Sequence, residues 1–278
     1  MSPVVRLRLL HRHPSSNSDH LSKLIRLEKI QFLSIVLLHF ALPRESKYNF
    51  SMTPLSKKPL RLALVGMSGA GKSYWTKRLA AENIPAISCD SQIESRLAHT
   101  LQEGGFQGIN GVAAWMGWPD SPEYAERESQ YLAEEIASLD EVLTSLEKDP
   151  QRALVLDTTG SVIYTGNNLL FRLRKLMTVV YLAASNEEHE LLIQRYLKDP
   201  KPVLWRGAFQ PRNGESPHDT VARCYPALLA GRRQGYQALA HCTIAVAELR
   251  ELPDESEADG KTAGAAFLEK VRRQLQRA

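Results

Sequence analysis

The sequence predicts an α/β protein of three layers, in which a five-stranded parallel sheet is flanked by helices. Five short apolar runs predict the strands, at residues 60–65, 84–88, 153–156, 178–182 and 243–246. Polar or helical stretches separate these runs, and strands that alternate with helices form parallel sheets covered on both faces. With 278 residues, 43% of them apolar, the chain is long enough to bury such a core.

The segments between the predicted strands differ in character. The first strand ends in glycine and is followed by a predicted helix over residues 72–82. One long helix is predicted over residues 124–147, because apolar residues recur there at helical spacing, at Tyr131, Leu132, Ile136, Leu139, Leu143 and Leu146. Residues 104–122, which contain paired glycines and two tryptophans, are expected to form an irregular insertion.

Two further segments complete the second half of the chain. Residues 198–219 are rich in Pro, Gly, Arg and Lys without periodicity, and are predicted to form a mobile lid loop. An acidic linker at residues 251–259 precedes a final amphipathic helix, marked by Phe267, Leu268, Val271 and Leu275.

The first 58 residues differ in composition from the rest. Residues 1–51 hold eight of the 35 basic and three of the 31 acidic residues, a charge of +5, which leaves 27 basic and 28 acidic residues, or −1. The apolar run at residues 30–42 is too short to span a bilayer. A transit peptide, a signal-like segment and a stretch upstream of a natural start at Met52 are the three interpretations, and we favour the last. The predicted parts are therefore an N-terminal extension (1–58), a P-loop domain (59–250), and the acidic linker with the C-terminal helix (251–278).

Composition also bears on partners and compartment. A charge of −1 outside the N-terminal segment gives no surplus positive charge for a nucleic-acid backbone. Cys89, Cys224 and Cys242 form no C-x-x-C pair, which argues against a disulfide framework or a zinc site and favours a reducing compartment. We expect a cytoplasmic monomer that binds neither nucleic acid nor membranes, with organelle targeting by residues 1–51 as the alternative.

The segment between the first strand and the helix carries a phosphate-binding pattern. It matches G-x-x-x-x-G-K-S, the P-loop, in which glycines let backbone amides face phosphates. Lys72 would reach the β and γ phosphates, and the Ser73 hydroxyl would ligate Mg²⁺. A chance glycine-rich turn is the alternative, and the position between strand and helix argues against it. The predicted fold is thus the P-loop NTPase three-layer fold, and the predicted nucleotide-binding residues are Gly66, Met67, Ser68, Gly69, Ala70, Gly71, Lys72, Ser73 and Tyr74.

Two aspartates follow predicted strands. Asp157 ends the run 153–156, where P-loop proteins place an aspartate that holds Mg²⁺ directly or through water. Asp90 follows the second run and has two interpretations, a helix N-cap and a group that orients and deprotonates an acceptor hydroxyl. The predicted cofactors are therefore ATP and Mg²⁺.

Residues 64–73, Leu79-Ala80 and the segment 90–96 resemble the shikimate kinases, P-loop phosphotransferases that move the γ-phosphoryl group of ATP to a hydroxyl of shikimate. The resemblance covers about residues 60–246 and implies the strand order 2-3-1-4-5. It implies that Asp90 is catalytic and contacts the substrate, and that Arg195 packs on the adenine. It further implies that Lys201, in the lid, contacts phosphate and substrate, and that Arg232 binds a substrate carboxylate.

The chain differs from the family pattern on the acceptor side. Ser88-Cys89-Asp90 replaces Asp-Ser-Asp, and Thr158-Thr159-Gly160-Ser161 replaces a glycine triplet, so that Thr159 and Gly160 become the substrate-loop candidates. Ala125 stands where a second substrate arginine is expected, with Arg127 two residues on. A lost arginine contact costs about 1.5 to 3 kcal/mol, which argues against shikimate itself.

The function predicted from the sequence is transfer of the ATP γ-phosphoryl group to a hydroxyl of a small metabolite, with shikimate as one candidate. The alternative is an ATP-binding regulatory P-loop protein without transfer activity.

Overall fold

The computed structural model describes residues 59–198, 201–252 and 262–277. The N-terminal extension expected over residues 1–58 and most of the acidic linker expected over residues 251–259 lie outside these ranges. The expectations for a start at Met52 and for targeting by residues 1–51 therefore stay predictions.

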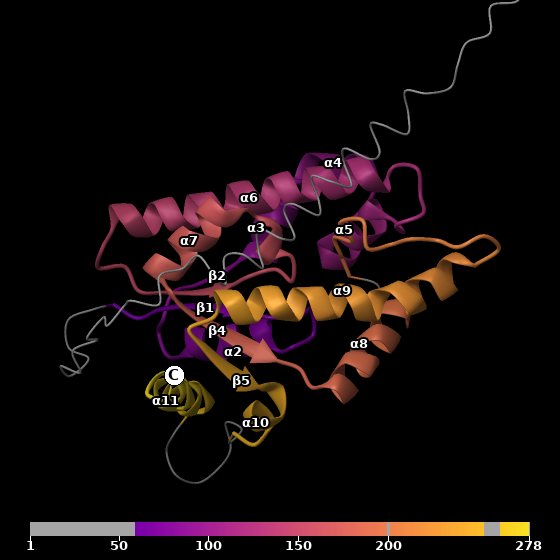
Figure 1. Cartoon of the computed structure of the whole chain (residues 1–278). Helices are drawn as coiled ribbons and strands as arrows, with labels where there is room; N and C mark the ends of the chain where they lie inside the picture. Colours follow the sequence, from indigo (N-terminus) through magenta and orange to yellow (C-terminus); the bar gives the residue numbers. More distant parts are fainter. Residues whose placement is uncertain (1–58, 199–200, 253–261, 278) are drawn as a thin grey trace, which may run out of the picture. The chain divides into compact units, whose positions relative to one another are not determined.

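Five strands and their connecting helices follow one another in the alternation that the sequence predicts (Figure 1). The strands are β1 (Arg61–Val65), β2 (Ala86–Ser88), β3 (Leu154–Asp157), β4 (Thr178–Ala183) and β5 (Cys242–Ala245). The helices are α2 (Lys72–Ala81), α3 (Cys89–Arg96), α4 (Ala98–Glu103), α5 (Gly108–Met116), α6 (Tyr124–Lys148), η1 (Val162–Tyr164, a short 3₁₀ turn), α7 (Asn167–Leu176), α8 (Asn186–Lys198), α9 (Pro217–Leu239), α10 (Val246–Arg250) and α11 (Ala263–Leu275).

The strands form one parallel sheet in the order β2-β3-β1-β4-β5, which confirms the predicted fold class and strand order. Successive residues of β1 enter opposite faces: Leu62 and Leu64 belong to one buried apolar cluster, whereas Ala63 and Val65 belong to another. Because side chains alternate along a strand, both faces of the sheet are covered, and its strands are apolar throughout.

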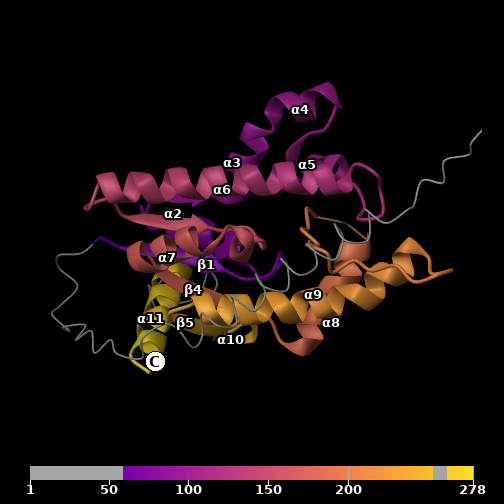
Figure 2. The ribbon, with the colours of Figure 1, turned by 45° about the horizontal axis from the view of Figure 1, so that its top comes forward.

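The two apolar clusters separate the helices into two layers. Figure 2 shows the two long helices, α6 and α9, with α3, α4 and α5 beside α6. One face of the sheet packs against residues of α3, α5, α6, α7, α8 and α9. The other face packs against α2, α10 and α11, and α11 contacts both α2 and β5. β4 follows β3 in the chain but lies on the other side of β1 in the sheet. The carboxyl ends of β1 and β3 therefore lie side by side at the switch point of the strand order, where α/β sheets bind ligands.

Three local expectations were wrong. The stretch 104–122 is not irregular throughout, because the apolar residues Val112, Trp115 and Met116 are buried on one helix, α5. On α6, Tyr131, Leu139, Leu143 and Leu146 are buried as expected, but Ile136 is 37% exposed and Glu135 is buried in its place. On α11 the expected apolar position Leu275 is 40% exposed.

In the described ranges, each helix is too short or too polar to cross a lipid bilayer.

Candidate active site

The P-loop wraps from the end of β1 to the start of α2 in a conformation that glycine permits. Gly66, Gly69 and Gly71 have φ angles of 147°, 83° and 91°, in the region that side chains disfavour. A Cβ atom at Gly66 would lie 2.8 Å from the carbonyl oxygen of Leu182, so the loop passes against the backbone of β4. The amide of Ala70 donates to the carbonyl oxygen of Met67 at 3.2 Å and closes the turn. The fold is the P-loop NTPase three-layer fold.

Lys72 points back into the P-loop. Its Nζ donates to the carbonyl oxygens of Gly66 and Met67, both at 3.0 Å, and its side chain is buried. Burial lowers the pKa of Lys72, and the charges of Asp157 and Asp90 oppose that shift. The lysine and the two predicted aspartates thus meet at the carboxyl edge of the sheet.

Asp157 lies beside Ser73, as the predicted Mg²⁺ site requires. It pairs with Leu64 of β1 in the sheet register, and its carboxylate forms a hydrogen bond with the Ser73 side chain. Burial raises the pKa of Asp157, and its Oδ1 atom is buried without a hydrogen-bond partner among the described residues. A buried carboxylate oxygen without a partner, next to a hydroxyl, fits Mg²⁺. This cation prefers oxygen ligands, and proteins usually supply only one or two of them. Within the described ranges, three or more His, Cys, Asp or Glu side chains do not gather to form a denser metal site.

Asp90 lies in the first turn of α3 and does not cap it. Ser88 is the N-cap, and its hydroxyl accepts from the amide of Ser91 at 3.3 Å. The Asp90 carboxylate instead accepts from the Tyr131 hydroxyl of α6 at 3.2 Å, and burial raises the pKa of Asp90. Because Ser88 caps the helix, the Asp90 carboxylate is not needed to accept from the amides at the start of α3.

The loop after β3 brings Gly160 between the P-loop and α9. A Cβ atom at Gly160 would lie 3.3 Å from Arg232 Nη1 and 3.5 Å from the backbone nitrogen of Ser68. The hydroxyl of Tyr236, one turn after Arg232 on α9, donates to the carbonyl oxygen of Gly160. The structure therefore gathers the predicted residues Gly160 and Arg232 at the mouth of the P-loop.

Glu135 is the residue that sequence reasoning missed. It is 1% exposed on α6, one turn after Tyr131, and accepts hydrogen bonds from the hydroxyls of Thr159 and Ser161, the second at 2.6 Å. Burial raises its pKa from 4.5 to about 7. A glutamate within a long polar helix gives no local sign of burial. We call Asp90, Tyr131, Glu135, Thr159, Ser161 and Arg232 the acceptor cluster.

Residues 201–216, the part of the predicted lid (198–219) that precedes α9, have no regular structure but are packed on the domain, and we call them the lid. Trp205 is 1% exposed, and the carbonyl oxygen of Leu204 accepts from Arg232 Nη2 at 2.8 Å. Lys201 Nζ donates to Asn110 Oδ1 of α5. The backbone amide of Arg206 donates to Glu128 Oε1 of α6 at 3.0 Å. The lid thus spans from α5 and α6 to α9.

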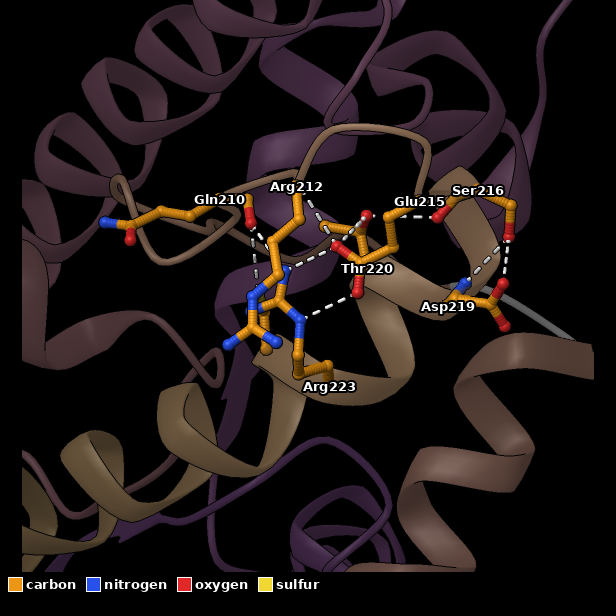
Figure 3. A network of polar contacts seen from close by, with 8 residues as sticks. Gln210, Arg212, Glu215, Ser216, Asp219, Thr220 and Arg223 are labelled. Atoms are coloured by element: carbon orange, nitrogen blue, oxygen red, sulfur yellow. Dashed lines mark hydrogen bonds and ion pairs between the residues drawn. The ribbon is translucent and has the colours of Figure 1, made fainter.

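The end of the lid is fastened to the first turns of α9 by Glu215 (Figure 3). Its carboxylate accepts from Arg223 Nε at 2.7 Å, from the Thr220 hydroxyl at 2.9 Å and from the Arg212 amide at 3.1 Å. The hydrogen bond from Arg223 lowers the pKa of Glu215 to about 2. Ser216 caps α9 by accepting from the Asp219 amide at 3.2 Å. This network fixes where the lid ends.

Three predicted site residues lie elsewhere or are incompletely described. The guanidinium of Arg127 donates to the carbonyl oxygen of Trp115 at the end of α5, at 2.6 Å, and lies outside the acceptor cluster. The Tyr74 side chain is 48% exposed. The side chain of Arg195 lies outside what the structure describes. Its helix, α8, does approach the P-loop, since a Cβ atom at Gly69 would lie 2.9 Å from Leu192 Cδ2.

Among solved structures, the neighbours include shikimate kinases, the family that the sequence resembles. The enzyme from Acinetobacter baumannii, in complex with shikimate, is 23% identical with a TM-score of 0.46, over 79% of this chain and 96% of that chain. The enzyme from Bacteroides thetaiotaomicron is 19% identical with a TM-score of 0.45, over 78% and 98%. The enzyme from Aquifex aeolicus is 16% identical with a TM-score of 0.44, over 78% and 99%. No protein-family model matches the chain, and no curated protein matches it. The fold assignment therefore rests on this chain's own strand order and P-loop.

Proposed function

We propose that the chain is an ATP-dependent phosphotransferase that transfers the γ-phosphoryl group of ATP to a hydroxyl of a small metabolite. One observation carries the proposal: Lys72, bound by P-loop carbonyl oxygens, lies near Asp157, which is paired with the end of β1, and near Asp90, and both carboxylates act on its charge. A phosphate-binding cation, a metal-binding carboxylate and a carboxylate able to act on an acceptor therefore meet at one edge of the sheet.

Each of these groups has a distinct role in the proposal. The P-loop amides and Lys72 bind the β and γ phosphates, and Ser73 and Asp157 hold Mg²⁺. Bound Mg²⁺ supplies neutralising charge at those phosphates. Lys72 is held by the carbonyl oxygens of Gly66 and Met67, so its ammonium is oriented before nucleotide arrives.

Asp90 is the candidate base. The acceptor oxygen forms a bond to the γ-phosphorus, and the bond from that phosphorus to the bridging oxygen of ADP breaks. ADP leaves with the electron pair, and the proton of the acceptor hydroxyl passes to Asp90. A raised pKa, which burial gives to Asp90, makes a carboxylate a better proton acceptor near neutral pH.

The lid and the described cysteines support two further parts of the proposal. Closure of residues 201–216, with Lys201 approaching the phosphates, would exclude water that competes with the acceptor. Cys89, Cys224 and Cys242 are all buried free thiols, which suits the reducing cytoplasm. We expect a monomer that binds no nucleic acid, which light scattering and a filter-retention assay with an oligonucleotide would check.

The proposal is tested by ADP release coupled to product detection, with shikimate, gluconate and nucleosides as acceptors. Lys72→Ala and Asp90→Asn should each lower kcat at least about a hundredfold, because each removes a group that acts on the transition state. The matched controls are Lys77→Ala, on the exposed side of α2, and Asp120→Asn, on an exposed turn, both of which should leave kcat unchanged.

Turnover that survives Lys72→Ala or Asp90→Asn would remove the mechanism. Tight Mg·ATP binding without a phosphorylated product from any acceptor would instead support a regulatory nucleotide-binding protein.

A further inference from the structure

Glu135 lies at the centre of the acceptor side of the site. Its two carboxylate oxygens face the loop after β3, where the hydroxyls of Thr159 and Ser161 donate to them. One turn earlier on the same helix, Tyr131 donates to Asp90. Residues four apart on a helix lie on one face, so α6 presents Glu135 toward the same region as the candidate base.

The charges around Glu135 disfavour an anionic acceptor. The charge of Asp90 acts on Glu135 and raises its pKa, whereas the charge of Arg232 lowers it. Of the two arginines that the sequence suggests for a ligand carboxylate, only Arg232 belongs to the acceptor cluster, because Arg127 is bound to α5. The carboxylates of Glu135 and Asp90 therefore gather here with one guanidinium, while the ammonium of Lys72 is bound by P-loop carbonyl oxygens on the phosphate side. Like charges in a buried site repel by several kcal/mol in magnitude.

Arg232 offers a buried donor to an oxygen ligand. Its side chain is 3% exposed, and its Nε–H is buried without a hydrogen-bond partner among the described residues. Its Nη2 is already used by the carbonyl oxygen of Leu204. The Nε–H can therefore donate to an oxygen of a bound ligand, a hydroxyl oxygen included. Buried polar groups without a partner are uncommon and point to a ligand.

We propose that Glu135 is a specificity-determining residue that selects uncharged, polyhydroxylated acceptors and rejects acceptors that carry a carboxylate. This inference rests on the proposed phosphotransfer and names the class of acceptor. A hydroxyl can donate to Glu135 and accept from Arg232 or from the Thr159 hydroxyl, so a polyol satisfies both kinds of group. A carboxylate can only accept, and it meets the charges of Glu135 and Asp90.

Matched pairs of compounds that differ in one carboxylate test the inference. Glucitol is compared with gluconate, and methyl shikimate with shikimate. Binding of each compound to the full chain loaded with Mg·ADP is measured by calorimetry at pH 8, and phosphotransfer from ATP is measured in parallel. Wild type should prefer the uncharged member of a pair by about tenfold or more. Glu135→Gln should bring that ratio within about threefold of unity, while Glu135→Asp, which keeps the charge, should retain the preference.

The matched control is Glu141→Gln, an exposed glutamate on the same helix, which should leave the ratio unchanged. If the role of Glu135 is purely structural, Glu135→Gln will weaken the binding of both members of a pair equally. That result overturns the inference. Preference of wild type for gluconate or shikimate, or no binding of either uncharged compound at millimolar concentration, also overturns it, even where Glu135→Gln fails to fold. Selective binding without any phosphorylated product would contradict the proposed function and leave the acceptor class intact.

Discussion

The Tyr124 hydroxyl of α6 lies 2.6 Å from the carbonyl oxygen of Val203 in the lid and accepts from the Trp205 amide at 3.1 Å. It also lies 3.0 Å from Glu128 Oε1, and burial raises the pKa of Tyr124. One phenol therefore satisfies two backbone groups of the lid and links the lid to the helix that carries Tyr131 and Glu135. A buried hydroxyl that serves several partners is costly to remove, because its partners then lose their hydrogen bonds without gaining water.

We expect Tyr124→Phe to lower the free energy of unfolding by about 1 to 3 kcal/mol and to raise KM for ATP more than it lowers kcat. The stability change follows from the orphaned Val203 and Trp205 groups, and the KM change follows from a looser lid. Urea unfolding and steady-state kinetics measure the two effects. Phe171→Leu, at a side chain that is 62% exposed on α7, is the control. An unchanged KM for ATP would mean that this anchor does not influence the nucleotide site.

Helix α11 packs against α2, the helix that begins at the P-loop. Trp75 of α2 stacks on Phe267 of α11, with ring centroids 4.9 Å apart and an interplanar angle of 24°. Both rings are buried. Phe267→Ala should lower the free energy of unfolding by about 3 to 5 kcal/mol because it leaves a cavity under α2. Thermal and urea unfolding would measure the loss.

Leu275→Ala is the control for that change, since Leu275 lies on the same helix and is 40% exposed. It should cost less than about 0.5 kcal/mol. Equal losses for Phe267→Ala and Leu275→Ala would show that α11 does not support α2 as the structure implies.

Asp157→Asn should raise the Mg²⁺ concentration needed for half-maximal phosphotransfer by about tenfold or more, because a neutral amide binds a hard cation more weakly than a carboxylate. The free Oδ1 atom of Asp157 and its neighbour Ser73 are the observed basis. Initial rates over a range of Mg²⁺ concentrations at fixed ATP measure the change. Asp149→Asn, on the exposed end of α6, is the control. A Mg²⁺ dependence identical to wild type would place the metal away from Asp157.

The sequence predicts the sheet well because its information is local. The predicted bounds of each apolar run agree with those of a strand to within two residues. The P-loop is a contiguous pattern, and its glycines have the positive φ angles that the loop requires. One position of α6, Ile136, was predicted wrongly for the opposite reason. Glu135 is buried because hydroxyls 24 and 26 residues later fold onto it, and Ile136 is displaced to the surface.

The same distinction applies to the candidate site. Lys72, Ser73 and Asp157 could be found from a motif and from a strand end, whereas the acceptor cluster is assembled from α3, α6, α9 and the loop after β3. Arg127 lies in the expected helix, α6, but its guanidinium donates to the carbonyl oxygen of Trp115 on α5. The direction of a long side chain is decided by tertiary packing, which the sequence pattern does not show. The catalytic and binding roles of these residues stay predictions.

Glu135 makes the stability of the domain depend on pH. Its pKa is about 7 in the folded state against an ordinary 4.5, so the folded protein holds a proton that the unfolded chain releases. Below pH 4.5 both states are protonated, and the full stability is present. As pH rises from 4.5 through 7, the unfolded chain gives up this proton before the folded protein does, so the free energy of unfolding falls. Each pKa unit corresponds to about 1.4 kcal/mol, so Glu135 should account for a loss of about 3 kcal/mol between pH 4.5 and pH 8.

Urea unfolding of wild type and Glu135→Gln at pH 5, 6, 7 and 8 isolates this contribution, because the other carboxylates titrate in both proteins. The wild type should lose stability relative to the variant as pH rises, and the difference should level off above about pH 8. The curves should be closest at pH 5, where Glu135 is protonated in the folded protein and a glutamine amide imitates it. Asp90 also carries a pKa raised by burial and faces Glu135, so Asp90→Asn should reduce the pH dependence of wild type as well. Parallel curves for wild type and Glu135→Gln across this range would mean that the Glu135 carboxylate is already ionised at pH 5, held by Thr159, Ser161 and Arg232 strongly enough to offset its burial.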